Sequence, residues 1–291
     1  MSSQRQLYFT RKLQRVVETT ALVLVDHTCC GSFRPLKLEV GFGYPGELEP
    51  LRLAVRDEAS LQLIGRIDRI DQARWGDEVY LRVIDYKSGT VGISLDDIYH
   101  GLRLQLLVYL DVVLSNARRL LDGAAVPAGM LYFSIQNPVI RARAPMSREA
   151  IEQEKRKAFK LKGMVLAERE LVNLMDQDID GDSQVIPVGI KKDGEFKAGS
   201  MVVTREQFDR LRCHLHHILA GAGGEILAGE VGIAPYRKKG RRACDYCRFK
   251  SVCQFDLMIG NKFRVLKDLK NDEVWEKIPE HPVEMGGDGF A

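Results

Sequence analysis

Two β-rich runs joined by a polar turn constrain the fold of this chain more than any other feature. The runs are LQLIGRIDRID at residues 61–71 and VYLRVIDYKSG at residues 79–89, and a turn containing Gly-Asp at 72–78 separates them. Runs rich in Val, Ile and Leu on both sides of such a turn predict a β-hairpin. The chain should therefore contain a β-sheet that includes this hairpin.

The residues after the hairpin predict a mixed fold. We expect a long helix at 96–121, with Ser94 and Asp97 as a capping pair, and then a buried strand at 128–135. Strand, helix and strand in this order favour a crossover onto the same sheet. The fold class is therefore α/β: a small mixed sheet flanked by helices. The other expected elements are helices at 1–27, 147–162 and 205–223, a short strand at 36–43 and a polar, glycine-rich loop at 176–200.

Acidic and basic side chains meet at one edge of the predicted hairpin. Asp85 and Lys87 are two residues apart on one strand, so both side chains face the same side, and Asp68 ends the partner strand. Two carboxylates held together repel each other unless a cation lies between them, and Mg²⁺ accepts such oxygen ligands. A neighbouring lysine can stabilise charge on a phosphate. The pattern fits metal-assisted phosphodiester hydrolysis, and a charged surface hairpin is the alternative.

Two polar-tipped residues lie within the apolar run that follows. Gln105 and Tyr109 are four residues apart, hence on one face of the expected helix. In isolation they equally suit an ordinary amphipathic helix with a tyrosine at the edge of the core. Following the D-x-K pattern, they become candidates to support the site and a DNA strand.

The segment CDYCRFKSVCQFD at 244–256 contains Cys244, Cys247 and Cys253. No apolar run approaches the roughly 20 residues of a membrane span, and the N-terminus lacks a signal-peptide pattern, so we expect a cytoplasmic protein. Thiols stay reduced there, which favours a metal site over disulfides; zinc is one candidate. Residues 237–250 carry seven Lys or Arg against one Asp, which predicts either a polyanion nearby or a solvated basic face.

At this point the motifs resemble a known family. GRIDRID, VIDYKSG and GLRLQLLVYL resemble the RecB-type branch of the PD-(D/E)XK nucleases. PAGMLYFSIQNP at 127–138, IAPYR at 233–237 and the cysteine segment extend the resemblance, over nearly the whole chain, to the nuclease region of the AddB family. It implies Asp68 and Asp85 as ligands of Mg²⁺, Lys87 as the catalytic lysine, and Gln105 and Tyr109 as the Q-x-x-x-Y motif.

The resemblance also implies a function and partners. The expected activity is that of a metal-dependent DNA exonuclease module, acting with an AddA-like helicase–nuclease subunit in the repair of double-strand breaks by homologous recombination. Two alternatives stay open: a catalytically inactive DNA-binding or scaffold piece, and a Cas4-like nuclease. The long segment at 139–235 argues against the second alternative. No G-x-x-x-x-G-K-S/T loop is present, so ATP hydrolysis by this chain is not expected.

In that family a [4Fe–4S] cluster is held by one cysteine before the nuclease core and three after it. The three match Cys244, Cys247 and Cys253, and Cys₄ ligation suits such a cluster. The position of the family's fourth cysteine is not matched by Cys29 or Cys30, and its early metal-binding histidine has no counterpart. Instead, His27 is interpreted as an ordinary surface histidine, and Cys213 as a small hydrophobic residue on a helix.

The unmatched ligands lead to an expectation about domain organisation. We expect the C-terminal piece of a longer protein, in which residues 1–260 form an N-terminally truncated nuclease domain. This domain includes the cysteine segment at 236–260, and residues 261–291 form a C-terminal tail. The three clustered cysteines should converge, with no fourth cysteine of this chain completing their site.

Overall fold

A computed structural model describes residues 3–56, 59–89, 91–121, 123–140 and 144–280. The chain divides into two compact units made of interleaved stretches. The first unit comprises Met1–Leu51, Gln62–Ile93 and Gln105–Arg212, and the second comprises Arg52–Leu61, Ser94–Leu104 and Cys213–Ala291. The expected division into residues 1–260 and 261–291 stays a prediction.

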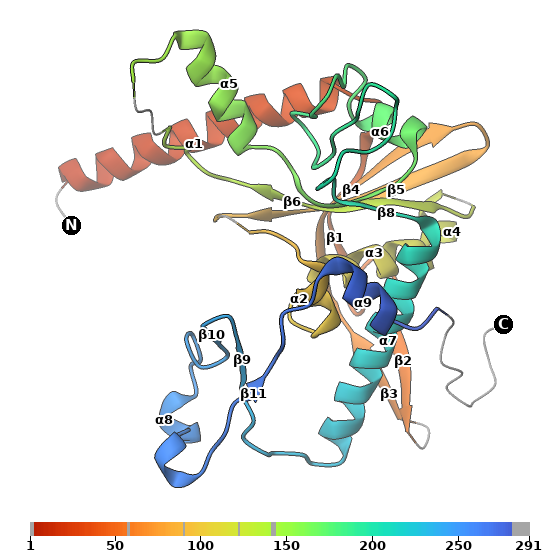
Figure 1. The fold of residues 1–291 in the computed structure, drawn as a ribbon, viewed down its shortest axis with the longest axis vertical. Helices are drawn as coiled ribbons and strands as arrows, with labels where there is room; N and C mark the ends of the chain where they lie inside the picture. The colour runs from red at the N-terminus through yellow and green to blue at the C-terminus, as the bar shows by residue number, and fades with distance from the viewer. Residues whose placement is uncertain (1–2, 57–58, 90, 122, 141–143, 281–291) are drawn as a thin grey trace. The chain divides into compact units, whose positions relative to one another are not determined.

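The first unit is built on a six-stranded mixed sheet in the order β1-β4-β5-β6-β7-β8 (Figure 1). Antiparallel pairs join β1 to β4, β4 to β5 and β6 to β7, whereas β5 pairs with β6, and β7 with β8, in parallel. The parallel β5–β6 pair is the predicted crossover. The strands are β1 Arg34–Phe42, β4 Gly65–Trp75, β5 Glu78–Lys87, β6 Val126–Ser134, β7 Lys162–Leu166 and β8 Val202–Val203.

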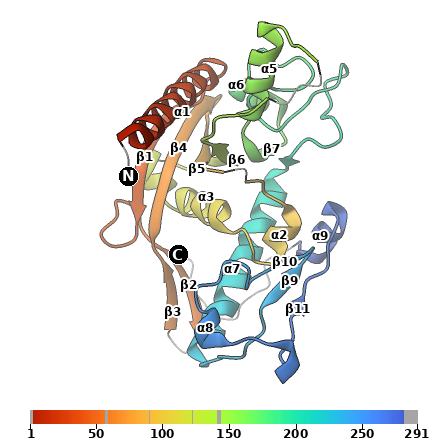
Figure 2. The same cartoon turned by 90° about the vertical axis from the view of Figure 1, so that its left-hand side faces the viewer.

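Helices flank this sheet on both sides, which confirms the predicted α/β class (Figure 1, Figure 2). On one face lie α1 Ser3–Cys29, α5 Arg148–Ala158 and α6 Arg169–Met175; on the other lies α3 Gln105–Ser115, followed by α4 Ala117–Leu121. Apolar side chains of the sheet and of α3 form the core, because both bury their apolar positions against each other. Fully buried examples are Ile67, Ile70, Leu81, Leu106, Leu107, Leu110, Met130 and Phe133.

The second unit contains shorter elements. Within it, β9, β10 and β11 form a three-stranded sheet in the order β10-β9-β11, and α2 contacts α9. Most of the two-stranded sheet of β2 and β3, and the second part of α7, also belong to it. The bounds are β2 Leu51–Arg56, β3 Ala59–Leu63, α2 Leu95–Tyr99, α7 Arg205–Leu227, β9 Tyr236–Lys238, β10 Arg241–Arg242, α8 Lys250–Cys253, the 3₁₀ helix Leu257–Ile259, β11 Arg264–Val265 and α9 Asn271–Lys277. No described helix has the length and apolar character needed to cross a membrane.

The predicted hairpin is confirmed as β4 and β5, but its turn is much shorter than predicted. Residues 72–75 continue β4, and the turn consists of Gly76 and Asp77, with Gly76 at φ 59°. Glycine adopts this left-handed conformation without the steric cost of a side chain. The run 61–71 is also divided, because β3 ends at Leu63 and β4 begins at Gly65.

The single helix predicted at 96–121 is wrong, since this stretch forms α2, α3 and α4. Ser94 caps α2 as predicted, and its hydroxyl accepts a hydrogen bond from Asp97 N at 3.4 Å. The chain then turns at Gly101, whose φ is 74°. A second break lies at Asn116, whose side-chain amide donates to the carbonyl oxygen of Val112 at 2.9 Å. Local hydrogen bonds of this kind compete with helix continuation.

The helix predicted at 205–223 extends further than expected. As α7 it continues past Gly221, Gly223 and Gly224 to Leu227. A β-carbon at Gly223 would lie 2.9 Å from Val55 Cγ2, so the glycine permits close packing rather than ending the helix. The other expected elements correspond to α1, β1, β6 and α5, and residues 176–200 contain no named helix or strand.

Candidate active site

Strand pairing places the two predicted carboxylates next to each other. In the antiparallel β4–β5 ladder Arg69 pairs with Ile84, so Asp68 and Asp85 occupy the following position. Asp68 lies within β4 rather than at its end, and its Oδ2 accepts a hydrogen bond of 2.8 Å from Tyr86 N. Asp85 is 2% exposed, whereas Asp68 is half-buried. Directly opposite residues of such a ladder carry β-carbons close enough for their side chains to interact.

A chain of polar contacts connects the strand to helix α3. Lys87 Nζ lies 2.6 Å from Asp85 Oδ2 and donates to Gln105 Oε1 at 2.9 Å. Gln105 Nε2 in turn donates to the hydroxyl of Tyr109 at 2.8 Å. Since α3 packs against β5 and β6, its first turn reaches the end of β5. The structure therefore brings Asp85, Lys87, Gln105 and Tyr109 together, beside Asp68.

The site has a negative electrostatic character. Burial raises the pKa of Asp85, and although Lys87 opposes this shift, the charge of Asp68 adds to it. Burial also raises the pKa of Tyr109, and the charges of Asp85 and Asp68 contribute further. The raised pKa values of Asp85 and Tyr109 mean that additional negative charge is unfavourable at this site. A bound cation would relieve that repulsion.

The oxygen atoms here fit a magnesium ion. Asp85 Oδ2 is buried without a well-aligned hydrogen bond, and Asp68 Oδ1 is not occupied by the Tyr86 contact. Among the described residues, no three His, Cys, Asp or Glu side chains gather as a metal-binding group. Mg²⁺ can bind through one or two carboxylates while it keeps several waters, and Asp68 and Asp85 are ligands of that type.

The opposite face of the same strands carries a buried ion network that the sequence did not reveal. Arg69 Nε lies 2.5 Å from Asp71 Oδ1, and Arg82 Nη2 lies 2.8 Å from Asp71 Oδ2. Arg82 also lies over the ring of Phe33, at 4.5 Å. The positions in GRIDRID could have shown that Asp68 and Asp71 lie on opposite faces, because successive side chains of a strand alternate between its two faces. The network supports the sheet rather than the candidate site.

His27 is not the surface residue that the sequence suggested. It is half-buried, and its ring makes an edge contact with Phe133 at 5.9 Å between centroids. Burial, followed by the charges of Arg82 and Arg69, lowers the pKa of His27 to about 4. The imidazole is therefore held neutral, and α1 uses it as a packing side chain.

The three clustered cysteines line one pocket of about 560 Å³ in the second unit, together with Arg242 and Lys250. Cys244 and Cys247 belong to one turn, in which Cys247 N donates to Cys244 O at 3.3 Å. Cys247 Sγ accepts a hydrogen bond of 3.4 Å from Phe249 N, and Cys253 ends helix α8. Their role as ligands stays a prediction.

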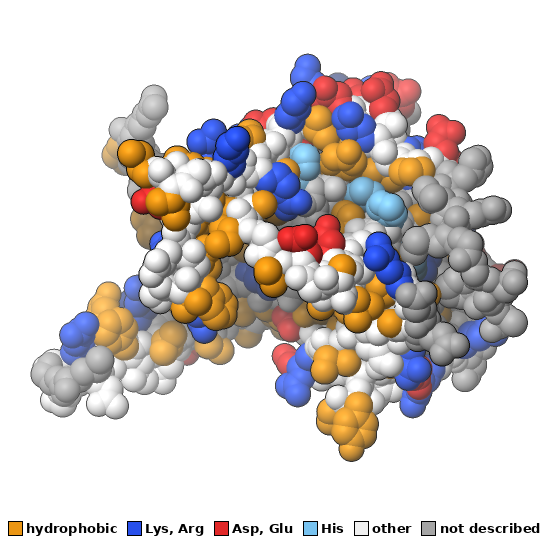
Figure 3. All heavy atoms as spheres, turned by 90° about the horizontal axis from the view of Figure 1, so that it is seen from below, with side chains coloured by type: hydrophobic (Ala, Val, Ile, Leu, Met, Phe, Trp, Pro, Cys, Tyr) orange, Lys and Arg blue, Asp and Glu red, His pale blue; other side chains and the backbone are white. Residues whose placement is uncertain are grey.

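The basic run before the cysteines is only in part a solvated face. Lys238 is 2% exposed, Lys239 pairs with Asp268 at 3.3 Å, and Arg242 pairs with Asp245 at 2.9 Å. Figure 3 shows Lys and Arg side chains separated by hydrophobic and uncharged ones on the face that it draws. Charge counting along the sequence therefore overestimates this basic surface only at Lys238, since the other cations of the run are exposed.

Comparisons with known proteins agree with this geometry. Residues 1–254 match the model of the PD-(D/E)XK nuclease superfamily. The B subunit of an ATP-dependent helicase/deoxyribonuclease from Pelotomaculum thermopropionicum is 47% identical over 280 residues, which are 96% of this chain and 24% of the relative. Proteins of the same name from Desulforamulus reducens and Bacillus mycoides are each 43% identical, over 96% and 99% of this chain and 24% and 25% of their own lengths. The chain thus spans about a quarter of the length of the curated relatives that it matches.

Proposed function

The chain belongs to the PD-(D/E)XK nuclease superfamily, and on that premise we propose that it is a metal-dependent deoxyribonuclease module that degrades DNA from its ends. The observation that carries this proposal is the contact chain from Asp85 through Lys87 and Gln105 to Tyr109, with Asp68 at the neighbouring ladder position. The stability of the hairpin alone does not explain why the half-exposed Lys87 lies between the buried Asp85 and helix α3.

Each residue of this set has a chemical role in the proposal. Asp68 and Asp85 would hold Mg²⁺, which when bound supplies a Lewis acid and a source of nucleophilic water. Lys87 places a positive charge beside the reacting phosphate, where negative charge develops. Gln105 fixes the position of the lysine ammonium through its carbonyl oxygen, and Tyr109 fixes Gln105 through its hydroxyl.

The names of the relatives extend the proposal to an assembly. Because similar proteins are named as the B subunit of an ATP-dependent helicase/deoxyribonuclease, we propose that this module works with an AddA-like subunit on DNA ends. Repair of double-strand breaks by homologous recombination is the process in which such end degradation is useful. The substrate in this proposal is DNA, and the duplex would be opened by the helicase.

The cysteine segment supports a second cofactor within the same proposal. Cys244, Cys247 and Cys253 line one pocket, and Arg242 and Lys250 beside them would offset the charge of thiolates. A [4Fe–4S] cluster takes four thiolates, and these residues would supply three of them, although they are not gathered as a metal-binding group among the described residues. We propose them as cluster ligands, with the fourth ligand supplied from outside this segment.

The carboxylate assignment is tested by the isosteric substitution Asp85→Asn. It removes a charged ligand and keeps the volume of the side chain, so cleavage of linear DNA with Mg²⁺ should fall by at least about 1000-fold. The matched control is Asp77→Asn, the same change at the exposed turn of the same hairpin, which should cut like the parent protein. Gel assays on single- and double-stranded ends measure the rates, and calorimetry measures Mg²⁺ binding.

Equal cleavage by the parent protein and Asp85→Asn would refute the assignment of this site. A parent protein that binds DNA without cutting it would support the inactive DNA-binding alternative instead. Loss of Mg²⁺ binding in Asp85→Asn, with the fold unchanged by circular dichroism, would support the ligand role independently of activity.

A further inference from the structure

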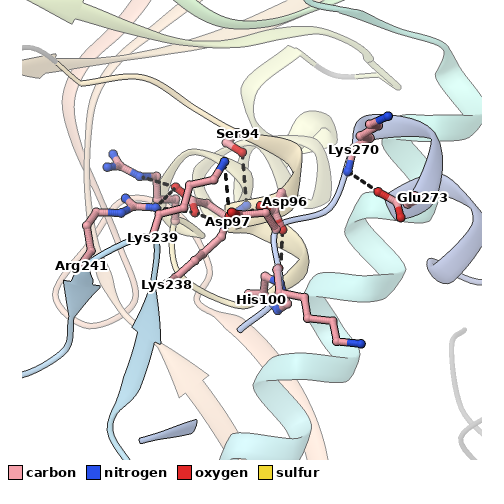
Figure 4. Close-up of polar contacts among 12 residues, drawn as sticks. Ser94, Asp96, Asp97, His100, Lys238, Lys239, Arg241, Lys270 and Glu273 are labelled. Carbon is pink, nitrogen blue, oxygen red and sulfur yellow. Dashed lines mark hydrogen bonds and ion pairs between the residues drawn. The ribbon is translucent and has the colours of Figure 1, made fainter. Parts of the chain in front are cut away.

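Two consecutive aspartates of α2 are buried around one lysine from the far end of the chain. Asp96 is 6% exposed, Asp97 is 4% exposed and Lys238 is 2% exposed. Lys238 Nζ lies 2.7 Å from Asp96 Oδ2 and 2.6 Å from Asp97 Oδ1 (Figure 4). All three residues belong to the second unit. One ammonium group therefore bridges two adjacent carboxylates that have very little contact with water.

Further donors complete the cluster unevenly. Asp97 also receives Arg241 Nη2 at 3.0 Å and Arg103 Nε at 3.1 Å. Among the described residues, the only other basic side chain near Asp96 is His100, whose Nε2 lies 3.2 Å from Asp96 Oδ1. The same nitrogen lies 2.8 Å from the carbonyl oxygen of Lys267. Loss of the lysine would thus leave Asp97 with two arginines and Asp96 with a histidine.

The ionised forms are stabilised despite burial. Burial lowers the pKa of Lys238, but the hydrogen bonds that its ammonium donates to Asp96 and Asp97 outweigh burial and raise the pKa above its ordinary value. Burial likewise raises the pKa of Asp97, and hydrogen bonds from Lys238 and Arg241 leave it lowered. Removing one member of a buried ion cluster is costly, because the remaining charge has neither water nor a partner.

The cluster joins two stretches of the chain, and each of them lies immediately before a segment with a proposed function. Arg103 is two residues before Gln105, and Lys238 is six residues before Cys244. We propose that Lys238 is a positioning residue, which fixes the turn ahead of the Q-x-x-x-Y helix to the strand ahead of the cysteine segment. Its effect on DNA cutting rests on the proposed nuclease function; its effect on the geometry of the second unit does not.

This role separates Lys238 from the other cations of the basic run. A side chain that is 2% exposed and directed at two carboxylates is not available to a phosphate. Lys239, the next residue, has a side chain that is 67% exposed and pairs with Asp268. Two adjacent lysines therefore offer a matched comparison between an internal positioning cation and a surface cation.

The test compares Lys238→Met with Lys239→Met in the full chain, by hydrogen exchange and by DNA cleavage. In Lys238→Met, amides of residues 94–104 and 236–253 should exchange about 100-fold faster, while amides of β4, β5 and β6 keep their protection. The double variant Lys238→Met/Asp96→Asn removes the carboxylate left with the weakest partner, and should return exchange to within about tenfold of the parent. Cleavage by Lys238→Met should show kcat lowered about tenfold with KM for DNA nearly unchanged.

The outcomes separate this inference from the proposed function. Equal exchange in the two single lysine variants, or no recovery in the double variant, would overturn the positioning role. Faster exchange confined to residues 94–104 and 236–253 in Lys238→Met, with recovery in the double variant, would support it. If the parent protein does not cut DNA, the nuclease proposal fails and exchange alone decides the geometric role. If the parent cuts and kcat is the same in every variant, the effect on the active site is refuted.

Discussion

Neighbouring side chains of β4 face different surroundings and therefore have different uses. Asp68 points to the side where α3 supplies Gln105 and is available to a cation, whereas Asp71 lies on the opposite face at 0% exposure, between Arg69 and Arg82. A carboxylate held by two guanidinium groups has no capacity left for a metal. The same residue type in one short motif thus serves the sheet at one position and the proposed chemistry at another.

His27 makes a prediction about stability and pH. Its pKa is lowered from 6.5 to about 4 in the folded protein, so the unfolded chain binds this proton first as the pH falls. The contribution of His27 is therefore fully favourable above about pH 6.5, and it decreases as the pH falls toward 4. The free energy of unfolding should lose up to roughly 3 kcal/mol across this window from this group.

Urea denaturation at several pH values measures this effect as the difference between the parent protein and His27→Gln. The difference should change with pH between about 6.5 and 4 and be constant above that range. The exposed His217, changed to Gln in the same way, is the control for the loss of an imidazole at the surface. A pH-independent difference for His27→Gln would show that the imidazole is not held neutral by its surroundings.

Helices, strands and caps that depend on residues close in sequence can be predicted from the sequence, whereas the breaks within the predicted helix at 96–121 cannot. The hairpin follows from alternation and a turn, and the Ser94 cap follows from a hydroxyl placed before a helix. Gln105 and Tyr109 meet because they are four residues apart on α3. The breaks at Gly101 and Asn116 are not predicted, because the apolar periodicity indicates one helix and does not reveal the left-handed glycine or the hydrogen bond from the Asn116 side chain to Val112 O.

Glycines in two elements predict opposite effects of the same substitution. In β7, a β-carbon at Gly163 would collide with the carbonyl oxygen of Met130 and lie 2.9 Å from Leu131 Cα. Gly163→Ala should therefore lower the free energy of unfolding by about 2–3 kcal/mol. In α7, Gly221 has nothing within 4 Å of such a carbon, and Gly221→Ala should raise it by about 0.5–1 kcal/mol. Denaturation midpoints of the two variants, compared with the parent, measure both signs; a shift in the same direction would contradict the packing described for β6 and β7.

For the whole molecule, long-range pairings decide what sequence patterns leave open. Lys238 and Asp97 are 141 residues apart, and no local rule joins them. From the sequence, the seven cations of residues 237–250 predict a basic surface, because the sequence does not show which of them pair with carboxylates. The carboxylates of α2 hold Lys238 inside the protein and pair with Arg241 at the surface, and the net charge of +3 gives no indication of this arrangement.

The proposed cluster would make iron content depend on more than one segment, because the cysteine segment would supply three ligands and a fourth would come from elsewhere. Cys247→Ser should remove nearly all iron and sulfide from protein reconstituted without oxygen, since it leaves only two of the three clustered thiols on the pocket. Cys29→Ser, an exposed position on α1, should leave the iron content unchanged. Colorimetric iron and sulfide determinations measure the contents. Equal iron in both variants, with iron present in the reconstituted parent protein, would contradict the proposed cluster.

The separation of Lys238 from its aspartates has a consequence for synthesis on the ribosome. The 141 residues between Asp97 and Lys238 take about 7–28 s to translate at roughly 5–20 residues per second. During that time Asp96 and Asp97 lack the ammonium group of Lys238 with which they later pair, so their carboxylates stay hydrated. The first unit is complete in sequence at Arg212, before Lys238 is made. The nascent chain therefore has β4 and β5 available for folding well before the turn ahead of Gln105 can be fixed.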